Sequence, residues 1–282
     1  MFGGWFQAMG IKPRTEKKLA GYSSWYNRYQ DITEDTIRED LTGCRSLLCL
    51  GDLFQIDDGW EPKVGDWLET DAQKLAGNLK LKSVSAVKHV TDDYRMITGK
   101  RSHCVNEATE RTYSFENEVE QSLEVTFRVY NDGIAFKYGI NTVADEENVV
   151  HEHTTYAVPK GTRRWVQEYD PGYEKFFPLS TDGKLTNRPE VDLWGYPALV
   201  EPQDSVFMLI TEANIRRGHC GSLLYNGDQL DSYQVRLADK QPVGNGAWES
   251  PWRLLIVGNL SDVVESTLVT DVSDPSKEED TE

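Results

Sequence analysis

The residues with the clearest chemical potential are two neighbouring carboxylates, Asp57 and Asp58, with Trp60 two positions after the second. They follow residues 53–56, a short apolar run typical of a buried strand. In α/β folds, ligand-binding groups gather at the carboxyl ends of strands, so these side chains could bind a polar ligand. Vicinal aspartates beside a glycine are also common in turns, and both alternatives stay open.

Two further groups could bind a metal or line a site. His151 and His153 would point to one face of a strand, because side chains two residues apart do so. A zinc site takes about three or four protein ligands, and the pattern supplies no third ligand, so no metal is predicted at this pair. Glu212 follows the apolar run 206–210 and could line a site or cap the next turn; we predict the turn cap.

The elements that must position the aspartates form a strand, a helix and a second strand between Tyr22 and about Leu75. Asp31 is the predicted N-cap of the helix, with Glu34 as its capping-box partner. Apolar residues then recur at helical spacing, which predicts one apolar face made of Ile37, Leu41, Cys44 and Leu48.

A β-hairpin is predicted over residues 123–140. Apolar and polar residues alternate along 123–129 and again along 134–140, so each strand has one apolar face. Between the strands, residues 131–133 (Asn-Asp-Gly) are predicted to turn the chain, since these residue types tolerate positive φ angles. Arg128 and Lys137 lie on the polar faces, where we predict cross-strand partners such as Glu124.

From about Lys82 onward the pattern is almost entirely strand and turn. Further strands are predicted over 206–210, 232–237 and 253–257, with turn-forming Gly, Asn, Asp and Pro clusters between them. Many short strands with such turns predict an antiparallel sandwich. The domains are therefore a β-α-β piece over 1–80, a sandwich over 81–272 and an acidic linker or tail over 273–282.

Composition limits the classes of partner. A net charge of -17 argues against nucleic acid, which usually selects a basic stripe. No run reaches the roughly 18 apolar residues that can span a bilayer, so no membrane partner is predicted. The first residues lack the pattern of a secretory leader, and either a cytosolic chain or one separated from its leader fits. The cysteines show no CxxC spacing and are predicted to be reduced thiols: Cys44, Cys49, Cys104 and Cys220.

Residues 20–78 resemble the opening strand-helix-strand of the catalytic barrel in glycoside hydrolase family 36, the α-galactosidase family. The resemblance rests on SSWYNRYQDITEDTIRED and on LGDLFQIDDGWEPKVGDWLETDAQK. It implies that Trp25, Asp57, Asp58 and Trp60 face a sugar pocket. A βα barrel needs eight units and about 250 residues, and the resemblance covers one unit, so we predict a barrel fragment.

Residues 82–272 resemble the N-terminal domain of glycoside hydrolase family 97, a family of α-glucosidases and α-galactosidases. Five motifs occur in the order expected: DDYRMITGKRSHCVNEATE, FRVYNDGIAFKY, WVQEYDPGYEKFF, VFMLITEANI and ESPWRLLIVG. The resemblance implies a mainly β fold, an antiparallel β-super-sandwich similar to galactose mutarotase. We expect this sandwich to be incomplete at its N-terminus, where the barrel-like piece stands.

The family 97 resemblance implies a supporting role rather than catalysis. The carboxyl pair that hydrolyses a glycosidic bond lies in that family's barrel, so no catalytic residue is predicted here. The resemblance makes Glu174 a calcium ligand, and calcium takes about six to eight oxygens, so the site would need the barrel. The predicted partners are therefore an α-glucoside or α-galactoside and a catalytic barrel in a longer or separate chain. Two alternatives remain: a stand-alone carbohydrate-binding module, and an α-galactosidase-like hydrolase that uses Asp57 or Asp58.

Overall fold

The computed structural model of the chain describes residues 21–23, 34–44, 53–55, 68–70, 74–75, 79–96, 98–117, 122–141, 148–216, 219–227, 231–239, 241–242 and 247–274. The chain divides into two compact units, Met1–Asp66 and Trp67–Glu282. Among the described residues, no helix combines the length and apolar character needed to cross a membrane. Cys44, Cys104 and Cys220 form no disulfide bond within the described part of the chain, and Cys49 lies outside it.

The first unit contains β1 (Gly21–Ser23), α3 (Glu34–Cys44) and β2 (Leu53–Gln55). β1 and β2 pair in parallel, which requires a crossover connection, and α3 lies in that connection. The Tyr22 hydroxyl donates to Asp40 Oδ2 at 2.5 Å and so links β1 to α3. The predicted strand-helix-strand order is confirmed, whereas Asp31 and Leu48 lie outside the described residues.

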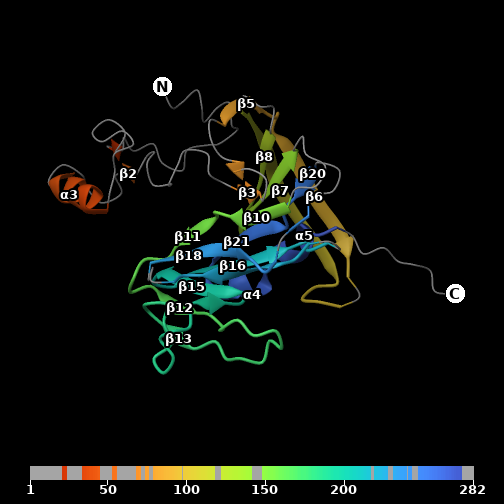
Figure 1. The fold of residues 1–282 in the computed structure, drawn as a ribbon. Coiled ribbons are helices and arrows are strands. Elements are labelled where there is room, and N and C mark those ends of the chain that lie inside the picture. The colour runs from red at the N-terminus through yellow and green to blue at the C-terminus, as the bar shows by residue number, and fades with distance from the viewer. Residues whose placement is uncertain are drawn as a thin grey trace. The chain divides into compact units, whose positions relative to one another are not determined.

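The second unit is built on a large antiparallel sheet (Figure 1). Its strand order is β13-β12-β15-β16-β21-β9-β8-β7-β5, with β20 paired to β9 and β6 paired to β7. The strands are β5 (Lys80–Val84), β6 (Lys88–Arg95), β7 (His103–Glu116), β8 (Ser122–Tyr130), β9 (Gly133–Asn141), β12 (Arg163–Trp165), β13 (Leu179–Ser180), β15 (Ala198–Gln203), β16 (Val206–Ala213), β20 (Ala247–Glu249) and β21 (Trp252–Gly258).

Two smaller antiparallel sheets complete the strands. One has the order β11-β18-β17-β14, made of β11 (Thr155–Ala157), β18 (Ser232–Leu237), β17 (Ser222–Tyr225) and β14 (Leu193–Trp194). The other has the order β19-β10-β3-β4, made of β19 (Gln241–Pro242), β10 (Asn148–Glu152), β3 (Leu68–Thr70) and β4 (Lys74–Leu75). The predicted mainly β, antiparallel fold class is confirmed.

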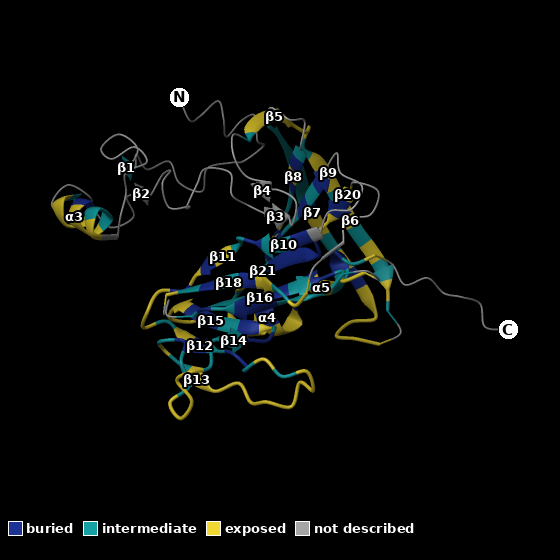
Figure 2. Ribbon diagram, in the orientation of Figure 1, coloured by how far each residue is buried: buried dark blue, intermediate teal, exposed yellow. Residues whose placement is uncertain are grey.

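The core lies between the large sheet and the sheet that contains β17 and β18. Its buried side chains come from both sheets, for example Val200 and Ile210 from one and Leu224 and Tyr233 from the other. Figure 2 shows this buried band along the central strands, with exposed loops beside β13. Two layers joined by interdigitating apolar side chains are the definition of a sandwich.

Two short helices, α4 (Leu260–Glu265) and α5 (Leu268–Asp271), cover part of the other face of the large sheet. Val263 and Leu268 pack there against Trp252, Leu254 and other apolar residues. The sequence pattern from about Lys82 onward predicted almost entirely strand and turn, and it did not predict these two helices. α4 begins at a capping box formed by Asn259 and Asp262, a local helix signal, whereas α5 has no side-chain cap.

The predicted hairpin is confirmed: β8 and β9 pair with Leu123 opposite Ile140 and Tyr130 opposite Gly133. The chain reverses at the predicted place, and residues 131–133 do so without positive φ angles. Gly133 is needed for another reason: a Cβ there would lie 2.3 Å from the carbonyl oxygen of Leu255 on β21. The turn also binds the helical segment, since Ser266 Oγ donates to Asp132 Oδ2 at 2.6 Å.

Candidate functional site

Only one of the predicted site residues lies in the described part of the chain. Trp25, Asp57, Asp58 and Trp60 fall outside the described residues. Glu174 lies in the loop 166–192, which runs from the end of β12 to the start of β14 and contains β13. This loop and the polar groups that hold it form the candidate site.

The Glu174 side chain follows a tight turn and is exposed. The Gly172 amide donates to Asp170 Oδ1 at 2.8 Å, and the Tyr173 amide donates to the Asp170 carbonyl at 3.0 Å. No group of three or more His, Cys, Asp or Glu side chains that could hold a metal ion occurs among the described residues. Glu174 alone does not fit a calcium ion, which takes about six to eight oxygens, so its role as a ligand stays a prediction.

His151 and His153 lie at the end of β10, with ring centroids 5.0 Å apart. Their proximity agrees with the predicted common face. They belong to no larger cluster of metal-binding side chains in the described ranges. Within those ranges, no third ligand of the kind that a zinc site needs lies beside the pair.

Buried polar side chains hold the base of loop 166–192. The Arg164 guanidinium has no exposed surface and donates to the carbonyls of Val158 and Pro159, each at 3.1 Å. The Trp194 indole donates to Asn226 Oδ1 at 3.0 Å, and Asn226 Nδ2 donates to the Gly183 carbonyl at 2.9 Å. Buried hydrogen bonds of this kind fix both ends of the loop relative to the sandwich.

The loop borders a half-open cavity of about 310 Å³ with both polar and apolar walls, which we call the loop cavity. An ion pair lies in its wall: Arg188 Nη1 donates to Glu168 Oε1 at 2.9 Å, and Arg188 Nη2 donates to Glu168 Oε2. Phe176 also lines the cavity, with 89% of its surface exposed. The lining residues are Glu168, Lys175, Phe176, Pro178, Leu185, Thr186, Asn187 and Arg188.

A second depression is mainly apolar, holds about 540 Å³ and is called the sheet groove here. Leu199, Phe207 and Leu209 contribute to it and also pack against the core cluster beneath α4 and α5, so the groove lies on that face of the large sheet. Its lining residues are Arg163, Trp165, Phe177, Pro197, Leu199, Phe207, Leu209 and Leu260. An apolar surface that stays open in this way is typical of an interaction site.

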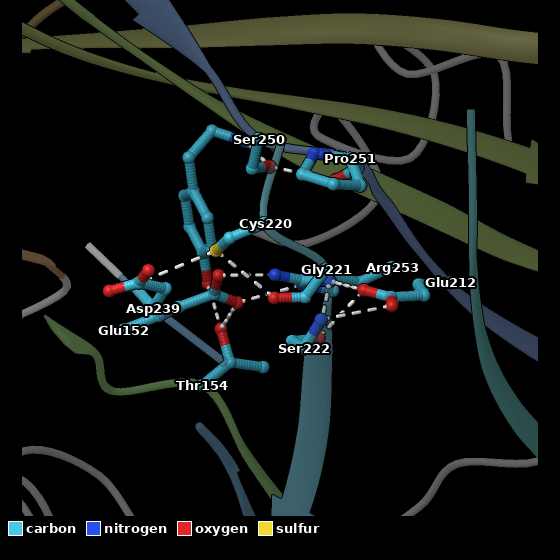
Figure 3. A network of polar contacts seen from close by, with 11 residues as sticks. Glu152, Thr154, Glu212, Cys220, Gly221, Ser222, Asp239, Ser250, Pro251 and Arg253 are labelled. Carbon is cyan, nitrogen blue, oxygen red and sulfur yellow. Dashed lines mark hydrogen bonds and ion pairs between the residues drawn. The ribbon is translucent and has the colours of Figure 1, made fainter. Parts of the chain in front are cut away.

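Inside the sandwich, Arg253 joins two carboxylates in a buried network (Figure 3). Its Nε and Nη2 donate to the two oxygens of Glu152 at 2.9 and 2.6 Å, and its Nη1 donates to Glu212. The Ser222 hydroxyl contacts both charged groups: it accepts a hydrogen bond from Arg253 and donates one to Glu212 at 2.7 Å. The predicted turn cap for Glu212 is wrong, because β16 directs this carboxylate toward Arg253 on the neighbouring strand β21.

The electrostatics of the buried network make it a structural feature. Burial alone would lower the pKa of Arg253, but the carboxylates of Glu152 and Glu212 raise it well above its ordinary value. The side chains of Arg253 and Glu152 have no exposed surface, so a substrate cannot reach them. This pair satisfies charges within the core instead of acting on a ligand.

The charged side chains of the hairpin have cross-strand partners, as predicted, but not with Glu124. Arg128 Nε donates to Glu110 Oε2 at 2.6 Å, and the two residues lie directly opposite each other in β8 and β7. Lys137 Nζ donates to Glu249 Oε1 at 2.9 Å. These contacts account for both cations without a ligand.

Sequence reasoning missed the ion pairs of the loop cavity and of the buried network. The buried network had a sequence signal, because an arginine within the apolar run of β21 needs buried partners of opposite charge. The ion pair of the loop cavity had a weaker one: Glu168 and Phe176 lie in the motif WVQEYDPGYEKFF, but Arg188 lies outside all five motifs. The pairing of Glu168 with Arg188 follows from how the loop folds.

Comparison with known proteins agrees with this architecture. The family model described as "Glycosyl-hydrolase 97 N-terminal" matches residues 63–275, a region that begins ahead of β3. A "Probable retaining alpha-galactosidase" of Streptomyces bingchenggensis (strain BCW-1) is 26% identical over 214 residues, covering 76% of this chain and 32% of the relative.

Two solved structures are similar over 75% of this chain. One is a beta-arabinopyranosidase with 25% identity and a TM-score of 0.65, of which 37% is covered. The other is a glycoside hydrolase family 97 enzyme in complex with acarbose from Pseudoalteromonas sp. strain K8, with 20% identity, a TM-score of 0.61 and 33% coverage; this likeness concerns the fold alone. The chain thus spans about a third of the length of these relatives.

The family match extends over the large sheet, the smaller sheets, both helices and loop 166–192. It is therefore a match to the whole sandwich rather than to one motif. The chain belongs to the family of glycosyl-hydrolase 97 N-terminal domains.

Proposed function

We propose that this chain is the non-catalytic, carbohydrate-associated sandwich of an α-glycosidase of the α-glucosidase or α-galactosidase type, and that it supports a catalytic barrel in a longer or separate chain. The observation that carries the proposal is the open, apolar sheet groove on a domain whose relatives are about three times as long. Groups that would perform hydrolysis are assigned to that barrel.

The barrel is the occupant that we propose for the sheet groove. Phe177 and Leu260 are exposed at the rim of the groove, and Trp165 and Phe207 line it with ring centroids 6.2 Å apart. The matched region ends at residue 275, just after α5, which packs on the same face of the sheet as α4. In a longer relative, the polypeptide after this region would leave the sandwich from the sheet face on which the groove also lies, so a following domain can cover that face.

The absence of catalysis is proposed from the chemistry of the carboxylates. Glycosidases need one carboxyl group as acid and a second as base or nucleophile, both in contact with substrate. Glu152 and Glu212 lie together in the sandwich core, and both form ion pairs with Arg253. Their side chains are buried, so neither is placed to contact a bound sugar.

Calcium enters the proposal through Glu174 together with ligands from the proposed barrel. Glu174 is exposed on loop 166–192 and could contribute one oxygen ligand. The remaining oxygens would come from the barrel. For the chain by itself we expect no tight calcium binding, which calorimetry with calcium chloride can measure.

A turnover assay tests the proposal. The purified chain is expected to leave p-nitrophenyl α-glucoside and p-nitrophenyl α-galactoside unhydrolysed. Turnover that copurifies with the chain would overturn the proposal. If Asp58→Asn then abolished this turnover, the alternative hydrolase that uses Asp57 or Asp58 would take its place.

A further inference from the structure

We propose that the loop cavity binds one ring of a neutral pyranoside, with Phe176 against the ring and the Glu168–Arg188 pair on its hydroxyls. Only the class of ligand rests on the proposed function, because the site itself is argued from the geometry of the loop. Its volume of about 310 Å³ lies at the small end of the range for ligand pockets, which suits a single sugar ring.

The Glu168–Arg188 pair has the hydrogen-bonding capacity that a sugar diol requires. A guanidinium has five N–H donors, and Arg188 uses two of them for Glu168. A carboxylate has about four acceptor positions, and these two bonds occupy one on each oxygen of Glu168. Two neighbouring hydroxyls could therefore donate to the carboxylate and accept from the guanidinium. Arg188 is 47% exposed, so a ligand can reach the pair.

Phe176 provides the apolar part of the site. Its ring is 89% exposed and lines the cavity together with the apolar side chains of Pro178 and Leu185. One face of a pyranose ring carries mainly C–H bonds, which pack on an aromatic face while the hydroxyls at the rim meet polar groups. An exposed aromatic ring beside hydrogen-bonding groups is the arrangement expected of such a ligand site.

The charges around the cavity favour a neutral ligand. Glu168 and Arg188 neutralise each other, and Lys175 lies 3.6 Å from Asp170. Neither a phosphate nor a carboxylate would find an uncompensated cation here. A neutral sugar is recognised through hydroxyls alone, for which Thr186 and Asn187 add further donors and acceptors.

The walls are held in place before a ligand arrives. Glu168 forms an antiparallel bridge with Trp194, whose side chain is buried at the base of the loop. Gln167 Nε2 donates to the Lys175 carbonyl at 2.6 Å, which fixes the residue before Phe176. The Arg188 amide donates to the Leu185 carbonyl at 3.2 Å. Preorganisation of this kind reduces the entropy cost of binding.

The experiment is a calorimetric and NMR titration of the 282-residue chain with methyl α-D-glucopyranoside and methyl α-D-galactopyranoside. Millimolar, saturable binding of at least one sugar is expected. Phe176→Ala and Arg188→Lys should each weaken it about tenfold, since one removes the ring and the other the planar fork. Phe176→Trp should restore or strengthen binding, because it supplies a larger aromatic face.

Tyr173→Ala is the matched control. Tyr173 is another exposed aromatic residue of the same loop and does not line the cavity. The substituted residues are all exposed, and a thermal melt of each variant checks that the sandwich is intact. Absence of saturable binding to both sugars, or equal loss in Tyr173→Ala and Phe176→Ala, would overturn the proposal. Failure of this site leaves the supporting role untouched, whereas turnover would overturn that role and not this site.

Discussion

The buried network and the loop cavity contain the same ion pair in two environments. In each, an arginine donates two hydrogen bonds to one glutamate: Arg253 to Glu152, and Arg188 to Glu168. The first pair has no exposed side-chain surface, whereas the side chains of Arg188 and Glu168 are 47% and 19% exposed. Identical functional groups therefore serve packing in the core and remain accessible to a ligand in the loop.

The reason for the difference is desolvation. Two charges taken out of water must find all their hydrogen bonds within the protein, and Ser222, Thr154 and Glu212 complete them around the buried pair. In the loop, water or a sugar can complete them instead. A third pair, Arg128 with Glu110, has intermediate burial, with side chains 19% and 16% exposed.

The largest loss of stability is expected from Arg253→Met. The substitution removes the cation and leaves Glu152 and Glu212 as buried charges without compensation. We expect a loss of about 3–5 kcal/mol in the free energy of unfolding. Urea denaturation of the variant and the wild type measures it. If Arg253→Met lowered the free energy of unfolding no more than Arg188→Met does, the proposed difference between the buried pair and the exposed pair would be wrong.

An intermediate effect is expected from Glu110→Gln, with a pH dependence that identifies its origin. Burial raises the pKa of Glu110, but Arg128 and Lys88 outweigh this and hold it below its ordinary value of 4.5. As the pH falls below 4.5, Glu110 takes up its proton more readily in the unfolded chain than in the folded one. The contribution of ionised Glu110 to stability is therefore present above pH 4.5 and is lost as the pH falls through the lowered pKa of the folded protein.

We expect Glu110→Gln to cost about 1–2 kcal/mol at neutral pH and much less in acid. Urea denaturation curves at a series of pH values provide the measurement. Glu107→Gln, a change of an exposed residue on the same strand, serves as the control. A cost independent of pH would show that packing, and not charge, accounts for the effect.

The smallest effect on stability is expected from Arg188→Met. An exposed ion pair contributes about 0–1 kcal/mol, and added salt screens it. The unfolding free energy should therefore stay close to that of the wild type, most closely at high salt, while sugar binding is lost. A variant that unfolds as easily as Arg253→Met would assign Arg188 to the support of the loop rather than to ligand binding.

Local patterns were sufficient for the individual strands and for their pairing in the hairpin. The period-two alternation of residues 123–129 and 134–140 predicted the strands β8 and β9. It could not show the role of Gly133, which depends on the approach of Leu255 from another strand. It also missed α4, whose capping box is a short signal within a region dominated by strands, and α5, which has no side-chain cap.

The sequence by itself determined the β-α-β order, the alternating strands and the five motifs that mark the family. These features depend on neighbouring residues or on residue identity, so they can be read along the chain. Only the tertiary structure decided which glutamate each arginine meets and how much water remains around the pair. Arg253 and Glu152 are 101 positions apart, and the packing of the sheets alone brings them together and buries them.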